Sequence, residues 1–176
     1  SLPQICRLSG LDTFITNKIA WCETNRFPHV TFNWRGIDGT EVLTHFTPGH
    51  NYNSSIHPQD FVDAEHRLNE SDGASGKSWL QPYGWGDGGG GPDHEQILNS
   101  EFAKASAGLP EIKRTSATEF CRTLHLESNT IGPRPIWDGE LYLELHRGTY
   151  TTHARLKAAN RNAERALREI EALGIL

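Results

Sequence analysis

The sequence has no methionine, no long hydrophobic run and no paired cysteines. No apolar segment approaches the roughly 18 residues of a membrane-spanning helix, so we expect no membrane partner. The odd number and wide spacing of Cys6, Cys22 and Cys121 indicate neither a disulfide framework nor a thiolate zinc site, and a reducing compartment fits best. Because Ser1 opens an apolar segment of the kind found inside proteins, we expect a piece of a longer chain.

Basic residues are also too few for a nucleic-acid partner. The chain of 176 residues carries 17 Lys and Arg against 22 Asp and Glu, a formal net charge of -5 that repels phosphate backbones. With 36% hydrophobic and 22% charged residues, the composition is that of a globular protein with a sizeable core.

Hydrophobic spacing predicts a mixture of strands and helices. Val30, Phe32 and Trp34 alternate with polar residues, Asp38-Gly39 is a tight-turn dipeptide, and residues 42–46 resume the alternation, so this segment predicts a β-hairpin. Residues 11–21 suit a buried strand followed by a loop, and further strands are expected over residues 79–83 and 140–146. Helices are expected over residues 58–68, 93–105, 116–126 and 151–173. The fold class is therefore α/β.

A glycine-rich loop, residues 84–91, is the clearest candidate site. Glycines allow positive φ angles and close approach to a ligand, at an entropic cost that a purely structural loop could avoid. Asp87 beside Trp85 could serve as a general acid next to a sugar stacked on the indole. Alternatively, Asp87 bonds turn amides, or the G-x-G-x-x-G spacing binds a dinucleotide. Three histidines close together in the sequence could bind a metal but are more simply structural: His45 in the strand pattern, and His50 and His57 beside a polar loop.

Several blocks of this sequence occur in the same order in a known enzyme family. They are Leu2-Pro3-Gln4-Ile5, Asn25-Arg26-Phe27-Pro28-His29, Trp34-Arg35-Gly36-Ile37-Asp38-Gly39, Leu43-Thr44-His45-Phe46, Tyr52-Asn53-Ser54, residues 83–92 and residues 140–151. Together they resemble glycoside hydrolase family 38, and most closely its cytosolic/vacuolar and bacterial α-mannosidase branch.

The resemblance implies a retaining, zinc-dependent α-mannosidase acting on terminal α-linked mannose of oligosaccharides in the cytoplasm. It implies part of an irregular (β/α) barrel of the glycoside hydrolase/deacetylase type, with a predominantly parallel sheet, over residues 1–148. Residues 149–176 would begin the helical bundle that follows. The zinc ligands and the nucleophile would lie outside this chain, so no residue here is expected to bind metal and the chain alone is expected to be inactive.

Carried over residue by residue, the resemblance makes Asp87 the acid/base, although other branches have two adjacent acidic or polar positions there. Tyr52 and His146 fall on sugar-contacting positions, Asn53 replaces a family Asp, and Trp85 borders the acid. The expected partners are the oligosaccharide substrate and the rest of the polypeptide, and a homo-oligomer is compatible with the sequence. The alternative function is a non-catalytic carbohydrate-binding or assembly module descended from such an enzyme.

Overall fold

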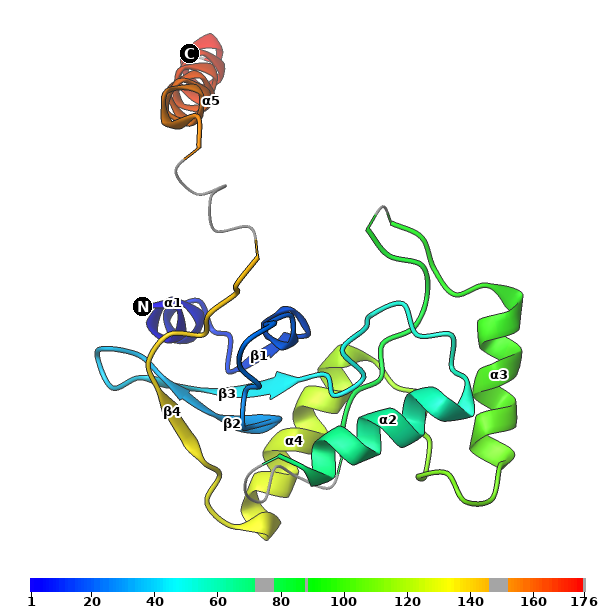
Figure 1. Cartoon of the computed structure of the whole chain (residues 1–176). Helices are drawn as coiled ribbons and strands as arrows, with labels where there is room; N and C mark the ends of the chain where they lie inside the picture. The colour runs from blue at the N-terminus through cyan, green and yellow to red at the C-terminus, as the bar shows by residue number, and fades with distance from the viewer. Residues whose placement is uncertain (72–77, 88, 146–151, 176) are drawn as a thin grey trace. The chain divides into compact units, whose positions relative to one another are not determined.

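The computed structural model describes residues 1–71, 78–87, 89–145 and 152–175 (Figure 1). The chain divides into two compact units, Ser1–Leu143 and Glu144–Leu176. The first unit contains a small mixed sheet with helices on both faces, and the second contains one long helix. The α/β class predicted from the sequence is thus confirmed. In the described residues, no helix has both the length and the apolar character needed to cross a membrane.

The sheet of the first unit has four strands in the order β1-β3-β2-β4. Their bounds are β1 Thr13–Thr16, β2 Thr31–Arg35, β3 Glu41–Phe46 and β4 Ile136–Asp138. β1 runs parallel to β3, and β4 runs parallel to β2. β2 and β3 form the predicted antiparallel hairpin, in which Gly39 has a φ of 82° and the Gly36 amide donates to the Thr40 carbonyl at 2.9 Å.

Helices cover both faces of this sheet, and successive side chains of β3 pack against one face and then the other. The helices of the unit are α1 Leu2–Leu8, η1 Lys18–Ala20, α2 Pro58–Asn69, α3 His94–Ala105 and α4 Ala117–Ile131. On one face, Val42 and Phe46 pack with Cys6 of α1. On the other face, Leu43 packs with Phe120 and Leu124 of α4. Because successive side chains of a strand point to opposite faces, α1 and α4 cover opposite sides (Figure 1).

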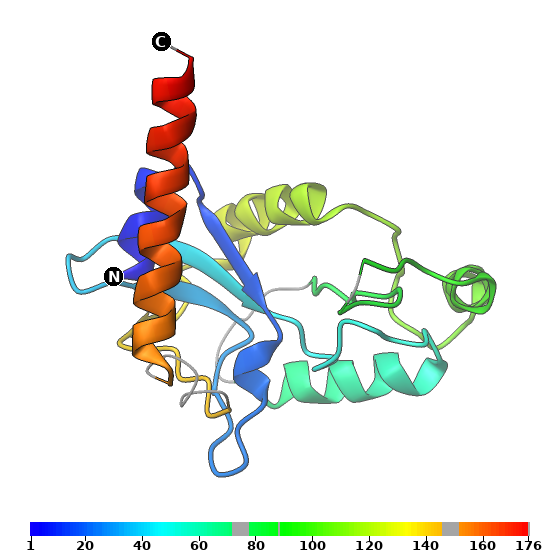
Figure 2. The ribbon, with the colours of Figure 1, turned by 90° about the horizontal axis from the view of Figure 1, so that it is seen from above.

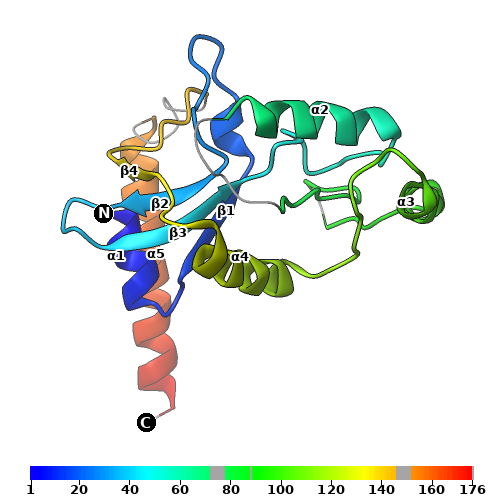
Figure 3. The same cartoon turned by 90° about the horizontal axis from the view of Figure 1, so that it is seen from below.

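A second small core lies beyond the C-terminal end of β3. Ile56, Phe61 of α2 and Ala103 of α3 are buried together there. Figures 2 and 3 show α2 and α3 extending away from α1 past the end of the sheet. This core fixes the α2 end of the loop that joins β3 to α2, and that loop carries part of the candidate site.

Two expected strands are wrong. Residues 78–83 form no strand but only a parallel bridge between Ser54 and Tyr83, because Pro82 has no N–H to donate to a ladder. Without a strand before the glycine loop, the dinucleotide alternative also loses its structural context. Residues 140–145 form no strand either, since the three-residue β4, which sequence analysis missed, takes the place beside β2. The short α1 was also missed.

The second unit consists of α5, Ala154–Gly174, which confirms most of the helix expected over residues 151–173. Its apolar side chains are largely solvent-exposed in this chain, between 61% and 70% of their surface. They are Leu156, Leu167, Ile170 and Leu173. A helix with such a stripe is typical of one that packs against further helices.

Candidate functional site

The predicted residues Tyr52, Asn53 and Asp87 come from two loops that the fold brings together. The first loop follows β3, and the second is the glycine-rich loop before α3. The Gly86 amide donates to Asn53 Oδ1 at 2.8 Å, and the Tyr52 hydroxyl donates to Asp87 Oδ1 at 3.0 Å. Sequence analysis had named these residues singly, and the structure places them in direct contact.

Ser54 anchors the first loop to both neighbouring helices. It is 1% exposed, and its hydroxyl donates to Asp60 Oδ2 of α2 at 2.8 Å. Its carbonyl accepts from Gln96 Nε2 of α3 at 3.0 Å. Asp60 also receives the His57 amide at 3.1 Å, closing the first turn of α2. Buried hydrogen bonds of this kind hold Tyr52 and Asn53 in one position relative to the glycine loop.

The glycine loop is closed on itself and lies tightly against the first loop. The Trp85 amide donates to the Gly91 carbonyl at 3.0 Å. A Cβ at Gly90 would lie 2.5 Å from the Trp85 carbonyl oxygen, and one at Gly86 would lie 2.9 Å from Asn53 Oδ1. Gly90 therefore requires glycine for steric reasons, whereas a Cβ at Gly86 would force the Asn53 side chain to shift.

Asp87 lies at the exposed end of this loop in a left-handed conformation, with a φ of 61°. Its Oδ1 accepts from Tyr52, and no main-chain amide of the described residues bonds to its carboxylate. Among the described residues, the carboxylate thus bonds a side-chain hydroxyl and not a turn amide. A carboxylate held by one side-chain donor and otherwise open to solvent is available to a ligand.

Trp85 is fixed at its polar edge and open elsewhere. Its Nε1 donates to Asp93 Oδ2 at 2.8 Å, and 52% of the residue is exposed. Asp93 is the N-cap of α3, and the pKa of its carboxyl is lowered by the Gln96 amide and then by the Trp85 indole. The α3 cap thus orients an indole that could pack against an apolar ligand surface.

Lys18 belongs to the same group of side chains and was missed by sequence analysis. Its Nζ donates to the Tyr52 hydroxyl oxygen at 3.1 Å. The ammonium also lies 3.7 Å from the centroid of the Trp21 ring and 4.8 Å from that of the Tyr52 ring. Its position after a strand could have indicated this contact. Because β1 and β3 are parallel, they end at the same edge of the sheet, and the residues that follow them lie close together.

The other predicted residues lie away from this group of side chains or outside the described residues. His146 lies outside the described residues. His45 is fully buried, accepts from the Leu80 amide at 3.3 Å and bonds Thr31, and burial lowers its pKa to about 3. Within the parts of the chain that the structure describes, no group of three or more His, Cys, Asp or Glu side chains could hold a metal ion.

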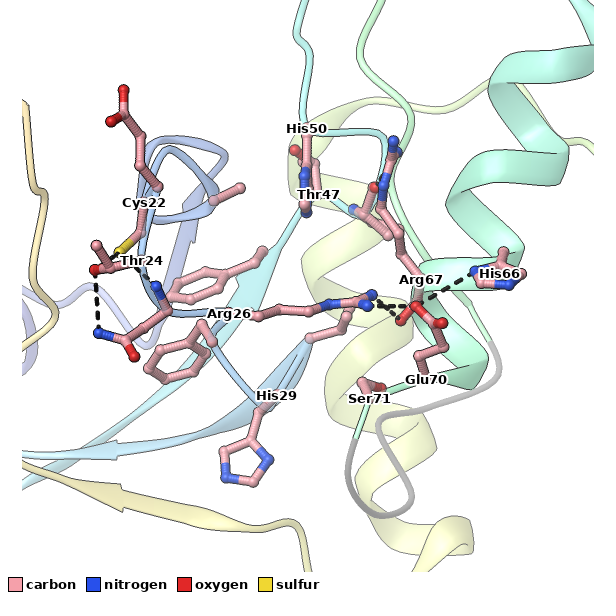
Figure 4. Close-up of a pocket in the computed structure, with 17 residues that line it drawn as sticks. Cys22, Thr24, Arg26, His29, Thr47, His50, His66, Arg67, Glu70 and Ser71 are labelled. Carbon is pink, nitrogen blue, oxygen red and sulfur yellow. Dashed lines mark hydrogen bonds and ion pairs between the residues drawn. The ribbon is translucent and has the colours of Figure 1, made fainter.

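A separate cavity of about 540 Å³ is lined by residues 20–30, the start of the loop after β3, and α2 (Figure 4). Arg26 forms an ion pair with Glu70, and Arg67 donates to the Pro48 carbonyl at 3.0 Å. Burial and these two arginines lower the pKa of His50 to about 4. Asp87 and Tyr52 do not line this cavity, and the arginines bond protein oxygens there, so the cavity is braced by its own ion pair.

Comparison with known proteins connects this geometry to a family. Residues 1–140 match the model of the glycosyl hydrolases family 38 N-terminal domain. The chain is 41% identical over 172 residues to alpha-mannosidase G of Dictyostelium discoideum, with 98% of this chain and 15% of that protein covered. It is 40% identical over 176 residues to alpha-mannosidase of Saccharomyces cerevisiae, covering 97% of this chain and 16% of the relative.

A third relative is alpha-mannosidase 2C1 of Homo sapiens, which is 38% identical over 175 residues, 99% of this chain and 16% of the human protein. The chain thus spans 15–16% of the length of these relatives. With most of its residues covered by the family model and identities near 40% along nearly its whole length, the chain belongs to glycosyl hydrolase family 38.

Proposed function

We propose that the chain is part of the catalytic domain of a retaining, zinc-dependent α-mannosidase that removes terminal α-linked mannose from oligosaccharides. The names of the three relatives support the class of substrate. The site is proposed chiefly from the exposed Asp87 carboxylate. Its Oδ1 accepts a hydrogen bond from the Tyr52 hydroxyl, and the glycine loop that bears it is hydrogen-bonded to Asn53. This carboxyl is the acid/base of the proposed reaction.

In this reaction Asp87 gives its proton to the glycosidic oxygen while the bond from that oxygen to the anomeric carbon breaks. The electron pair of the bond stays on the departing oxygen. A second carboxylate, outside this chain, attacks the anomeric carbon to form a covalent glycosyl-enzyme. Asp87 then takes a proton from the water that hydrolyses it, so that configuration is retained. Retaining geometry requires the two carboxyls about 5–5.5 Å apart.

The neighbours of Asp87 supply the proposed sugar contacts. Tyr52 and Asn53 offer a hydroxyl and an amide beside the carboxylate, and Trp85 offers a half-exposed indole for an apolar sugar face. His146 is proposed as a further contact on the strength of the family resemblance.

Zinc belongs to the proposal through the family, and this chain's residues do not fit a zinc site. Three or more potential ligands do not gather anywhere in the described segments, and the Lys18 ammonium lies beside Tyr52, where a second cation would be repelled. On the strength of the family resemblance, we place the zinc ligands in the full-length protein outside this chain. No step of the reaction described here passes through the metal.

The two units have separate proposed roles. The first would be part of a (β/α) barrel whose further strands pair with the outer strands β1 and β4. The second, whose α5 lies beyond the family match, would begin a helical bundle. We place the protein in the cytoplasm, a setting in which free Cys6, Cys22 and Cys121 remain reduced. The isolated chain, without a nucleophile, would be inactive.

The test replaces Asp87 with alanine in the full-length protein, assayed with zinc or cobalt present. For a mannoside with a poor leaving group, such as an alkyl mannoside, we expect kcat/KM to fall by about 10²–10⁴-fold, the usual contribution of a general acid. For an activated 2,4-dinitrophenyl mannoside we expect a much smaller loss of glycosylation rate, because that leaving group needs no proton.

The matched control is Asp138→Ala, which removes a carboxylate whose side chain is 68% exposed at the sheet edge. It should leave both substrates unaffected. Normal turnover of the alkyl mannoside by Asp87→Ala would remove Asp87 from the acid/base role. Release of β-mannose as the first product, followed by proton NMR, would contradict the retaining mechanism.

A further inference from the structure

Three contacts hold Lys18 just after the end of β1, one through its main chain and two through its ammonium. Its main-chain amide donates to Thr16 Oγ1 at 3.1 Å, which fixes the start of η1. Its Nζ lies over the Trp21 ring, 3.7 Å from the centroid, and donates to the Tyr52 oxygen at 3.1 Å. Lysine is normally a mobile surface side chain, whereas this one is partly buried and held between two aromatic rings.

The ammonium determines how the Tyr52 hydroxyl is used. An ammonium has three donors and no acceptor, so the Tyr52 oxygen must accept from Lys18. The single O–H of Tyr52 is then directed to Asp87 Oδ1, 3.0 Å away. Without Lys18, that hydroxyl could rotate and accept a hydrogen bond from the protonated Asp87 carboxyl instead of donating one.

This direction decides which oxygen of Asp87 can carry the transferable proton. While Oδ1 accepts from Tyr52, the acid form of the carboxyl is protonated on Oδ2, for which no partner exists among the described residues. Oδ2 is therefore the oxygen free to meet a ligand.

We infer that Lys18 is a positioning residue for the acid/base: through Tyr52 it keeps Asp87 Oδ1 as an acceptor and leaves Oδ2 to deliver the proton. The inference rests on the proposed acid/base role of Asp87. In the first step the Oδ2 proton moves to the glycosidic oxygen. In the second step Oδ2 takes a proton from the attacking water, and the hydrogen bonds from Lys18 to Tyr52 and from Tyr52 to Asp87 stay in place throughout.

The experiment uses the full-length protein and the same pair of mannosides as the Asp87 test. Lys18→Met keeps the apolar stem and removes the donor. We expect it to lower kcat/KM for the alkyl mannoside by about 10-fold or more, the scale of a lost charge-assisted hydrogen bond, and to change the dinitrophenyl mannoside by less than about 3-fold. Lys18→Arg, which also only donates, should recover most of the lost activity.

Tyr52→Phe removes the connecting hydroxyl, which is also a proposed sugar contact, so it should lower kcat/KM for both mannosides, and by a larger factor for the alkyl mannoside than for the dinitrophenyl mannoside. In the Tyr52→Phe background, Lys18→Met should cost little more, because residues that act through one another are not additive. The control is Lys104→Met, an exposed lysine in the last turn of α3, which should change neither substrate.

The outcomes are distinguishable. Equal losses on both mannosides with Lys18→Met, or fully additive losses in the double variant, would overturn the inference, since they indicate direct sugar binding or a structural role. If Asp87→Ala shows no dependence on the leaving group, the proposed function itself fails, whatever Lys18 does. If Lys18→Met is insoluble, the loss of kcat/KM on the alkyl mannoside is compared with the loss on the dinitrophenyl mannoside for Tyr52→Phe and Lys18→Arg instead. Equal losses on the two substrates in Tyr52→Phe would then overturn the inference.

Discussion

At the scale of single residues, Gly86 is a position where the two loops of the site approach each other closely. Its amide donates to Asn53 Oδ1, and an added Cβ would lie 2.9 Å from that oxygen and 3.3 Å from the Tyr52 ring. Small shifts of catalytic groups are costly, because acid catalysis depends on a fixed approach of the carboxyl to the bond that breaks.

Gly86→Ala should therefore displace the glycine loop from Tyr52 and lower kcat/KM for the alkyl mannoside by about 10-fold or more, on the scale typical of such misplacements. Gly91→Ala is the matched control, since a Cβ there meets nothing within 4 Å. Steady-state kinetics of the two full-length variants check this. Equal activities would mean that the loops are not coupled as the hydrogen bonds suggest.

The site residues differ in how far sequence could predict them. Asp87 and Trp85 stand out locally, because a carboxylate and an indole inside a glycine run are unusual. Tyr52 and Asn53 were found only through resemblance, since nothing local marks a polar loop residue as functional. Lys18 was missed because its contact with Tyr52 spans 34 residues and exists only once β1 pairs in parallel with β3.

At the scale of elements, α4 is the helix that fixes the back of β3. Leu124 is fully buried against Leu43 and Phe120, whereas Leu126, on the same helix, is 68% exposed. The two leucines therefore offer a comparison within one helix of burial against exposure.

Leu124→Ala should lower the free energy of unfolding by about 2–5 kcal/mol, the range for deleting a buried leucine side chain. Leu126→Ala should change it by less than about 0.5 kcal/mol, as for most surface substitutions. Urea unfolding of the full-length protein, monitored by hydrogen exchange of the α4 amides, measures this free energy. Equal effects would show that α4 is not anchored by its buried face.

Elements with strong local patterns were predicted, and those that depend on partners were not. The hairpin of β2 and β3 follows from alternation and a turn glycine, and α2 follows from its proline and apolar spacing. Residues 140–145 alternate equally well but have no neighbouring strand in the described part of the fold. Three-residue β4 is too short to show any period, and its strand exists only because β2 accepts it.

At the scale of the whole molecule, the buried His45 and the half-buried His50 make stability depend on pH. Burial, and then Arg134, lower the pKa of His45 to about 3, and burial with Arg67 and Arg26 lowers that of His50 to about 4. Both imidazoles are neutral in the folded protein at neutral pH. The unfolded chain, with an ordinary histidine pKa near 6.5, binds more protons in acid.

Stability should accordingly be complete above about pH 6.5 and decline as the pH falls toward 4, by up to about 1.4 kcal/mol per pH unit for His45 and by less for the partly exposed His50, whose charge is screened by solvent. His45→Gln should flatten this decline, while His94→Gln, at an exposed helix start, should not. Unfolding midpoints of the full-length variants between pH 7 and 4.5 measure the effect. A parallel decline in His45→Gln would exclude His45 as a cause.

The hydrogen bond between Asn53 and Gly86 has a consequence for modification of this chain. Asn53-Ser54-Ser55 is an acceptor sequence for N-linked glycans. A glycan would be attached to Nδ2 of the same side-chain amide whose Oδ1 accepts from the Gly86 main chain at 2.8 Å. Glycosylation at Asn53 would therefore place a bulky group one atom away from the hydrogen bond that joins the two loops.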